Sequence, residues 1–61
     1  MKGKVKWYNR MKEYGFITGE DNKDYFVYSS EITGSIDEGD DVEFEPVKAE
    51  KGVQAKGVKK V

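Results

Sequence analysis

The sequence of 61 residues predicts an all-β protein, a small barrel of five strands. Three observations support this fold class. Short segments of alternating apolar and polar residues recur along the chain, as they do in half-buried strands. Turn-forming residues separate these segments at intervals of about eight to twelve residues. No long segment has the periodicity of an amphipathic helix, and a chain of this length forms one domain, residues 1–61.

The first three strands are expected at residues 2–8, 14–18 and 24–28, paired as an antiparallel meander. Simple alternation places Val5 and Trp7 on the same face of the first strand, which would bury Trp7. A bulge or a strong bend in this strand would instead bring Trp7 to the opposite face. The pattern leaves both orientations open.

Two residues of the meander have predicted backbone roles. Gly15 lies inside the second strand, where the lack of a side chain permits close approach of another backbone or a ligand. Asn22 lies in the turn before the third strand and is a candidate for a positive φ angle.

The second half of the chain contributes a helical turn and two strands. Residues 29–32 are expected to form the turn, with a serine as N-cap and Ile32 as a buried anchor. Residues 33–39 form a loop, and the last two strands span residues 40–47 and 53–61. The expected core is the set of inward apolar residues Val5, Ile17, Val27, Ile32, Val42, Phe44, Val53 and Val58.

Composition excludes most catalytic chemistry. The chain has no cysteine and no histidine, and therefore lacks disulfides, thiolate ligands and the commonest general base. It also has no glycine-rich phosphate loop. Acidic residues within 37–45 could hold a cation, but a solvated acidic face is the favoured interpretation. We expect no catalytic residue, no metal, no cofactor and no small-molecule substrate.

Charge is strongly segregated although the net charge is only −1. Residues 1–19 sum to +4, residues 20–50 to −9 and residues 51–61 to +4. The first and last strands of a closed barrel can lie close together, so the two basic segments are candidates for one patch. A solvated surface without a partner is the alternative. No signal peptide or membrane-spanning segment is evident, and we expect a cytoplasmic protein without a membrane partner.

Aromatic residues are concentrated in one part of the chain. Seven of the eight rings lie within residues 7–28. Four of them have the opposite strand parity to Ile17 and Val27, and would share the open face of the sheet: Tyr14, Phe16, Phe26 and Tyr28. Rings beside basic residues can stack on unpaired bases. A core built from these rings is the alternative, but the apolar residues already suffice for so small a barrel.

Three stretches of this sequence resemble the cold-shock domain family: residues 3–9 (GKVKWYN), 12–17 (KEYGFI) and 24–28 (DYFVY). The second half matches more loosely, at residues 38–44 and 52–55. The resemblance implies a five-stranded antiparallel OB-fold barrel that binds single-stranded RNA and DNA. It also implies a cytoplasmic role as an RNA chaperone or as a regulator of transcription or translation.

The resemblance also implies a binding site. The family's base-stacking positions correspond to Trp7, Tyr8, Phe16, Phe26 and Tyr28, with Tyr14 at a neighbouring aromatic position. Polar positions beside them correspond to Lys6, Lys12 and Asp24. The family places its tryptophan on the binding face. The basic side chains expected to attract phosphates are Lys4, Lys6, Arg10, Lys12 and Lys56.

Four departures from the family pattern bear on affinity. Glu13 stands where the family usually has glycine, Tyr28 replaces a histidine, and Ser29 replaces a phenylalanine. The loop after Ile32 is also shorter and lacks an aromatic residue. Losing two stacking platforms predicts weaker binding, and it motivates a competing hypothesis, a protein-interaction module that kept the barrel. Asymmetric charge and short edge strands make a monomer the default expectation, with a dimer as the alternative.

Overall fold

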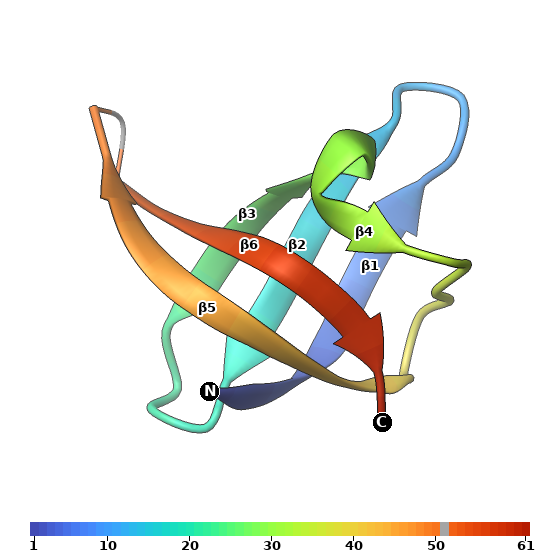
Figure 1. Cartoon of the computed structure of the whole chain (residues 1–61). Coiled ribbons are helices and arrows are strands. Elements are labelled where there is room, and N and C mark those ends of the chain that lie inside the picture. Colours follow the sequence, from blue (N-terminus) through green and yellow to red (C-terminus); the bar gives the residue numbers. More distant parts are fainter. Residues whose placement is uncertain (51) are drawn as a thin grey trace.

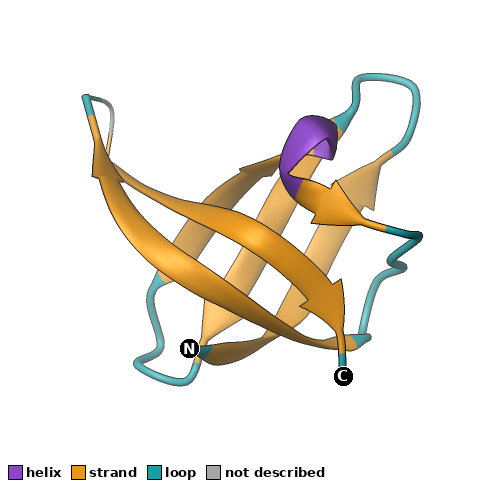
Figure 2. Cartoon of the chain, viewed as in Figure 1, coloured by secondary structure: helices purple, strands orange, loops and turns teal. Residues whose placement is uncertain are grey.

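The computed structural model describes residues 1–50 and 52–61. These residues form six strands and one 3-10 turn (Figures 1 and 2): β1 (Lys2–Asn9), β2 (Tyr14–Gly19), β3 (Asp24–Tyr28), η1 (Ser29–Glu31), β4 (Ile32–Thr33), β5 (Asp41–Ala49) and β6 (Gly52–Lys60). The five predicted strands are confirmed, with each boundary within two residues of the predicted one. The two-residue strand β4 was not predicted.

The strands form one sheet that closes on itself. Their order is β3-β2-β1-β5-β6-β4, and an additional pairing between β3 and β6 closes the barrel. In Figure 1, β5 and β6 cross over the meander of β1, β2 and β3. The β1–β2, β2–β3, β1–β5 and β5–β6 pairs are antiparallel, whereas β6 pairs in parallel with β3 and with β4. The predicted five-stranded barrel is therefore confirmed, with β4 added at its edge.

A bulge in β1 decides the orientation of Trp7. Val5 pairs with Ile17 and Trp7 pairs with Phe16, so Lys6 is an extra residue without an opposite partner on β2. An extra residue reverses the alternation of the strand beyond it. Val5 is therefore buried, while Trp7 turns to the opposite face of the sheet, beside Phe16. Of the two orientations that the sequence left open, the bulged one is found.

The core lies inside the barrel. Its buried residues are Val5, Ile17, Tyr25, Val27, Ile36, Val42, Phe44, Ala55 and Val58. Six of the eight predicted core residues are among them, while Ile32 and Val53 are only partly buried against the cluster. Tyr25, Ile36 and Ala55 are additional members. Ile36 is the least predictable of these, because it is an isolated apolar residue in a polar loop.

The helical turn is present but its predicted cap is wrong. The N-cap position of η1 is held by Tyr28, and no side chain caps the turn. The backbone of Tyr28 is still extended, because β3 runs directly into η1. Ile32 is likewise extended and begins β4. The positive φ angle predicted for Asn22 is confirmed at +64°.

Glu13 has a left-handed backbone, with φ of +61°. This conformation costs a residue with a side chain about 1 kcal/mol or more, and costs glycine almost nothing. We expect Glu13→Gly to raise the free energy of unfolding by about 1 kcal/mol, because relief of strain outweighs the greater freedom of glycine in the unfolded chain. In a domain of this size, that change raises the Tm by about 4–8 °C.

Thermal unfolding measures this effect, and two variants control for it. Glu13→Gln removes the charge but keeps the strained backbone, so its Tm should match that of the wild type. Glu20 lies in a turn and is not among the residues with a positive φ, so Glu20→Gly should lower the Tm. Equal Tm values for Glu13→Gly and the wild type would show that the strain is negligible.

Tyr25 is a buried core ring with a polar end. Its hydroxyl donates a hydrogen bond to Asp21 Oδ2 at 2.6 Å, and its ring contacts Phe44 at 5.0 Å between centroids. The hydrogen bond lowers the pKa of Asp21 and raises the pKa of Tyr25. The bond thus joins the β2–β3 turn to the core.

These two pKa shifts predict how the bond depends on pH. A lowered carboxyl pKa gives stability that is present above the ordinary pKa of aspartate, about 4, and is lost as pH falls through the folded value. A raised phenol pKa gives stability that is present below about pH 10 and is lost as pH rises through the folded value. We expect the Tm difference between wild type and Tyr25→Phe to be largest near neutral pH and to shrink in both acid and alkali. A difference independent of pH would contradict this account.

Candidate nucleic-acid interface

Five aromatic rings from β1, β2 and β3 form one contiguous cluster, the ring platform: Trp7, Tyr14, Phe16, Phe26 and Tyr28. Neighbouring ring centroids lie 4.6–5.5 Å apart. Most pairs meet edge-on or tilted, and one pair, Tyr14 with Phe26, is stacked at an interplanar angle of 16°. These are the arrangements that aromatic pairs favour.

Strand register explains why these rings meet. Trp7 pairs with Phe16 across β1 and β2, and Phe16 pairs with Phe26 across β2 and β3. Tyr14, two positions before Phe16 on β2, pairs with Tyr28 on β3. Side chains directly opposite in a sheet share a face and contact one another, so two rows of rings lie side by side. The predicted set of four rings on one face is found, and the bulge adds Trp7 to it.

The platform is open to solvent at one end. Tyr28 is 51% exposed, and the other four rings are half-buried against one another. Half-buried rings support their neighbours and still present an edge or face to a ligand. The residues of opposite parity, Ile17 and Val27, are fully buried. The rings therefore cover the outside of a barrel whose core is already filled.

Tyr8 does not join the platform. Its ring packs against the core and lines a separate pocket with Arg10 and Ser29. The bulge is the cause, because the reversal that turns Trp7 outward turns Tyr8 inward. The sequence alone leaves two orientations of Trp7 open, and it does not show that Trp7 and Tyr8 exchange faces.

A lysine, a carboxylate and a hydroxyl lie at the border of the platform. Lys6 Nζ donates a hydrogen bond to Asp24 Oδ2 at 2.9 Å, and Thr18 Oγ1 donates to Asp24 Oδ1 at 3.1 Å. The Lys6 bond, followed by the Thr18 bond, holds the pKa of Asp24 below its ordinary value. Asp24 is therefore ionised at neutral pH. The cluster offers a cation and an anion, which can bond the polar edge of a base.

A groove runs between the platform and the β5–β6 hairpin, with a volume of about 700 Å³. One wall carries the platform residues Phe16, Phe26 and Tyr28 together with Asp24. The hairpin supplies the other wall, residues Ala49, Glu50, Gly52, Val53 and Gln54. The parallel pairing of Phe26 with Gln54 brings the two walls together. This wall was not predicted as part of the site, because the pairing that positions it has no local sequence signal.

The predicted single basic patch is not found. Strand β5 lies between β1 and β6, and its carboxylates pair with lysines from both sides. Lys4 pairs with Asp41 at 3.8 Å, and Lys59 pairs with Glu43 at 3.7 Å. The acidic strand thus separates the two basic segments. Lys51 lies outside the described residues.

The remaining predicted cations occupy separate places. Lys12 is exposed in the loop between β1 and β2, and its backbone amide donates to Asn9 Oδ1. Lys56 is exposed on β6 and does not line the groove. Neither forms an ion pair with a described residue, whereas Arg10 pairs with Asp37. Lys12 and Lys56 thus keep their charge for a partner.

The described residues offer neither a metal site nor a membrane-spanning helix. Within residues 1–50 and 52–61, no group of three or more potential ligands could hold a metal ion. The described part of the chain also contains no helix long and apolar enough to cross a membrane.

Comparison with known proteins identifies the family. The family model described as the 'Cold-shock' DNA-binding domain matches residues 1–61. The chain belongs to the cold-shock domain family. The cold shock-like protein CspE of Bacillus anthracis is 49% identical to it over 63 residues, which cover 97% of this chain and 94% of the relative. The cold shock protein CspB of Geobacillus stearothermophilus is 45% identical, with coverage of 98% and 97%.

The family resemblance seen in the sequence is thereby confirmed. Cold shock proteins of this family are non-enzymatic binders of nucleic acid, consistent with the composition of the chain. In this chain, the ring platform lies on the outside of the barrel, with Tyr28 exposed.

Proposed function

We propose that this cold-shock domain binds single-stranded RNA and DNA by stacking unpaired bases on the ring platform. The observation that carries the proposal is the contiguous set of five rings on the outer face of β1, β2 and β3. Each base stacked on a protein ring contributes about 1–3 kcal/mol. Trp7, Phe16, Phe26 and Tyr28 are the stacking rings, and Tyr14 extends the surface between them.

The groove supplies the second part of the proposed site. Bases seated on Phe26 and Tyr28 face the β5–β6 hairpin, where the Gln54 amide offers both a donor and an acceptor. Asp24, which lines the same groove, and Lys6 can bond a base edge once they give up their mutual hydrogen bond. Stacking accepts every base, whereas these few polar groups add only weak selectivity.

Attraction between basic side chains and phosphates contributes less to the proposed affinity than base stacking does. Of the five cations predicted to attract phosphates, Lys4, Lys6 and Arg10 are paired with carboxylates, whereas Lys12 and Lys56 form no ion pair with a described residue. Each phosphate neutralised by a cation contributes to the fall of affinity with salt. We expect affinity to fall from low to moderate salt, with the shallow slope of one or two phosphate contacts on a single strand.

The proposed cellular role follows from reversible binding. A protein that binds unpaired strands and not duplexes keeps RNA unpaired by mass action, without ATP. This is the activity of an RNA chaperone, and it allows regulation of transcription or translation. We propose that the chain acts as a single-domain monomer in the cytoplasm, where such RNA is found.

Competition between strand forms tests the proposal. A fluorescently labelled single strand of pyrimidines should bind, and an unlabelled single strand should displace it. A blunt duplex of equal length should displace it poorly, because its bases are not available for stacking. Equal displacement by duplex and single strand would show that the rings do not contact bases.

A protein-interaction module is the second candidate, favoured by the ion pairs that neutralise Lys4, Lys6 and Arg10. In that case the rings contact a protein and not a base. Salt distinguishes the two, since binding through phosphates weakens with salt and a contact between rings and apolar groups does not.

A further inference from the structure

Negative charge lines the groove between the ring platform and the β5–β6 hairpin. Its lining includes two carboxylates, Asp24 and Glu50, and no lysine or arginine among the residues that the structure describes. Both carboxylates belong to residues 20–50, whose charges sum to −9. A surface of this kind repels phosphates and attracts cationic side chains. The groove therefore favours a basic partner as well as neutral bases.

Glu50 is the more available of the two carboxylates. Asp24 already accepts hydrogen bonds from Lys6 and Thr18. Glu50 follows the last residue of β5, is exposed, and forms no ion pair with a described residue. Its two oxygen atoms can accept a pair of parallel hydrogen bonds from one donor group.

An exposed aromatic ring lies on the opposite wall of the groove. Tyr28 is 51% exposed, and its ring is held by Phe26 at a centroid distance of 4.6 Å. A planar guanidinium group stacks on an aromatic face and bonds a carboxylate through two N–H donors. The ammonium group of lysine has neither a flat face nor a fork of donors. The combination of Tyr28 and Glu50 therefore selects arginine.

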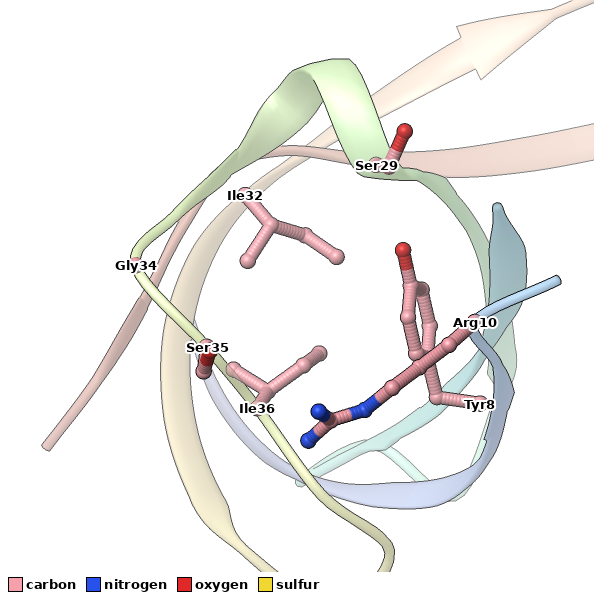
Figure 3. A pocket seen from close by; sticks show the side chains of 7 residues that line it. All are labelled: Tyr8, Arg10, Ser29, Ile32, Gly34, Ser35 and Ile36. Carbon is pink, nitrogen blue, oxygen red and sulfur yellow. The ribbon is translucent and has the colours of Figure 1, made fainter.

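A second pocket shows the opposite charge. The Tyr8 pocket, lined by Tyr8, Arg10, Ser29, Ile32, Gly34, Ser35 and Ile36, contains a cation, and in Figure 3 the Arg10 side chain extends into it. Arg10 is itself paired with Asp37. A further arginine would be repelled by this guanidinium, so the acidic groove is the better place for a basic partner.

We propose that the groove binds an arginine side chain of a basic protein segment, with its guanidinium stacked on Tyr28 and paired with Glu50. The partner is an extended, arginine-rich peptide segment of another protein. Tyr28 is also a proposed stacking ring for bases, so the protein segment and a nucleic-acid strand compete for it. The interaction itself requires no nucleic acid, and it can be tested whether or not the chain binds a strand.

Peptide binding in the absence of nucleic acid tests this proposal. The probe is a fluorescently labelled peptide of alternating arginine and glycine residues, and the matched peptide has lysine in place of every arginine. The two peptides carry the same charge, so a difference in affinity reports the stacking and the forked hydrogen bonds. We expect the arginine peptide to bind about two- to fivefold more tightly by anisotropy, the effect of one exposed contact between a cation and a ring.

Two variants of the hairpin test the ion pair. Glu50→Gln should weaken binding of the arginine peptide by about 1.5- to fivefold, the effect of one exposed ion pair. Glu45→Gln removes the same charge from an exposed position of β5 that does not line the groove, and it should bind the peptide as the wild type does. Glu50→Gln should not weaken binding of a pyrimidine strand, because the lost carboxylate repels phosphates.

NMR of the wild-type protein locates the peptide. The side-chain amide signals of Gln54, on the hairpin wall of the groove, should shift on binding, while Lys59, further along β6 and outside the groove, serves as reference. Four outcomes would each overturn the proposal: no binding of the arginine peptide, equal affinity for the two peptides, equal affinity of Glu50→Gln and Glu45→Gln, or unchanged Gln54 signals. Failure of a pyrimidine strand to bind would overturn the proposed function alone.

Discussion

Phe16→Ala and Phe26→Ala are each expected to weaken binding of a single-stranded oligonucleotide by about 5- to 150-fold, the loss of one stacked base. Both rings lie at the centre of the platform, where Phe26 contacts three other rings. Both are half-buried on the outer face of the sheet and do not belong to the buried core. The loss of affinity should therefore exceed the loss of stability. Fluorescence titration and thermal unfolding measure the two effects.

Two other substitutions provide the comparison. Met11→Ala removes an apolar side chain that is 95% exposed and outside the ring contacts, so neither affinity nor Tm should change. Phe44→Ala removes a ring from the core and should cost about 3–5 kcal/mol of stability. A large loss of Tm in Phe16→Ala or Phe26→Ala, with affinity unchanged, would mean that the rings support the fold and do not bind bases.

Gly15→Ala is expected to destabilise the barrel by about 1–3 kcal/mol or more, through overpacking. A Cβ atom at residue 15 would lie 2.4 Å from the Trp7 carbonyl oxygen and 2.8 Å from Tyr8 Cα. Both are backbone atoms of the paired strand, so relief requires β1 and β2 to move apart. A domain of this size has a small margin of stability. Denaturant unfolding should show a marked fall in midpoint.

The same substitution should also reduce nucleic-acid binding at temperatures where the chain remains folded, because Gly15 sets the distance between Trp7 and its neighbours on β2. Thr33→Ala, at an exposed position of β4, controls for the general effect of an alanine substitution in a strand. An unfolding midpoint for Gly15→Ala equal to that of Thr33→Ala would show that the strands accommodate the added methyl group.

The strands and most of the core were predictable because each strand of a small barrel has one buried face. Alternation alone identifies Ile17, Val27, Val42 and Phe44 as buried. Alternation also identifies the solvent-facing parity of the rings on β2 and β3. Burial and solvent-facing parity depend only on the order of residues within one strand, so they can be predicted without knowing which strands pair with it.

Other features depend on how strands pair, and the local sequence does not encode that pairing. The bulge at Lys6 arises from the register between β1 and β2, and it exchanges the faces of Trp7 and Tyr8. The groove wall at Gln54 depends on the parallel closure of β3 with β6. The prediction of a single basic patch was wrong for a related reason. The strand order places the acidic β5 between the two basic segments.

The central claim, that the platform stacks unpaired bases, is tested most directly by the emission of Trp7, the single tryptophan. The protein is titrated with a short oligo-pyrimidine strand at low salt, while the anisotropy of a labelled copy of the strand reports binding independently. We predict saturable quenching of Trp7 that follows the anisotropy and weakens with added salt. Binding by anisotropy without any change in Trp7 emission would contradict the claim, since the strand would then lie on another surface.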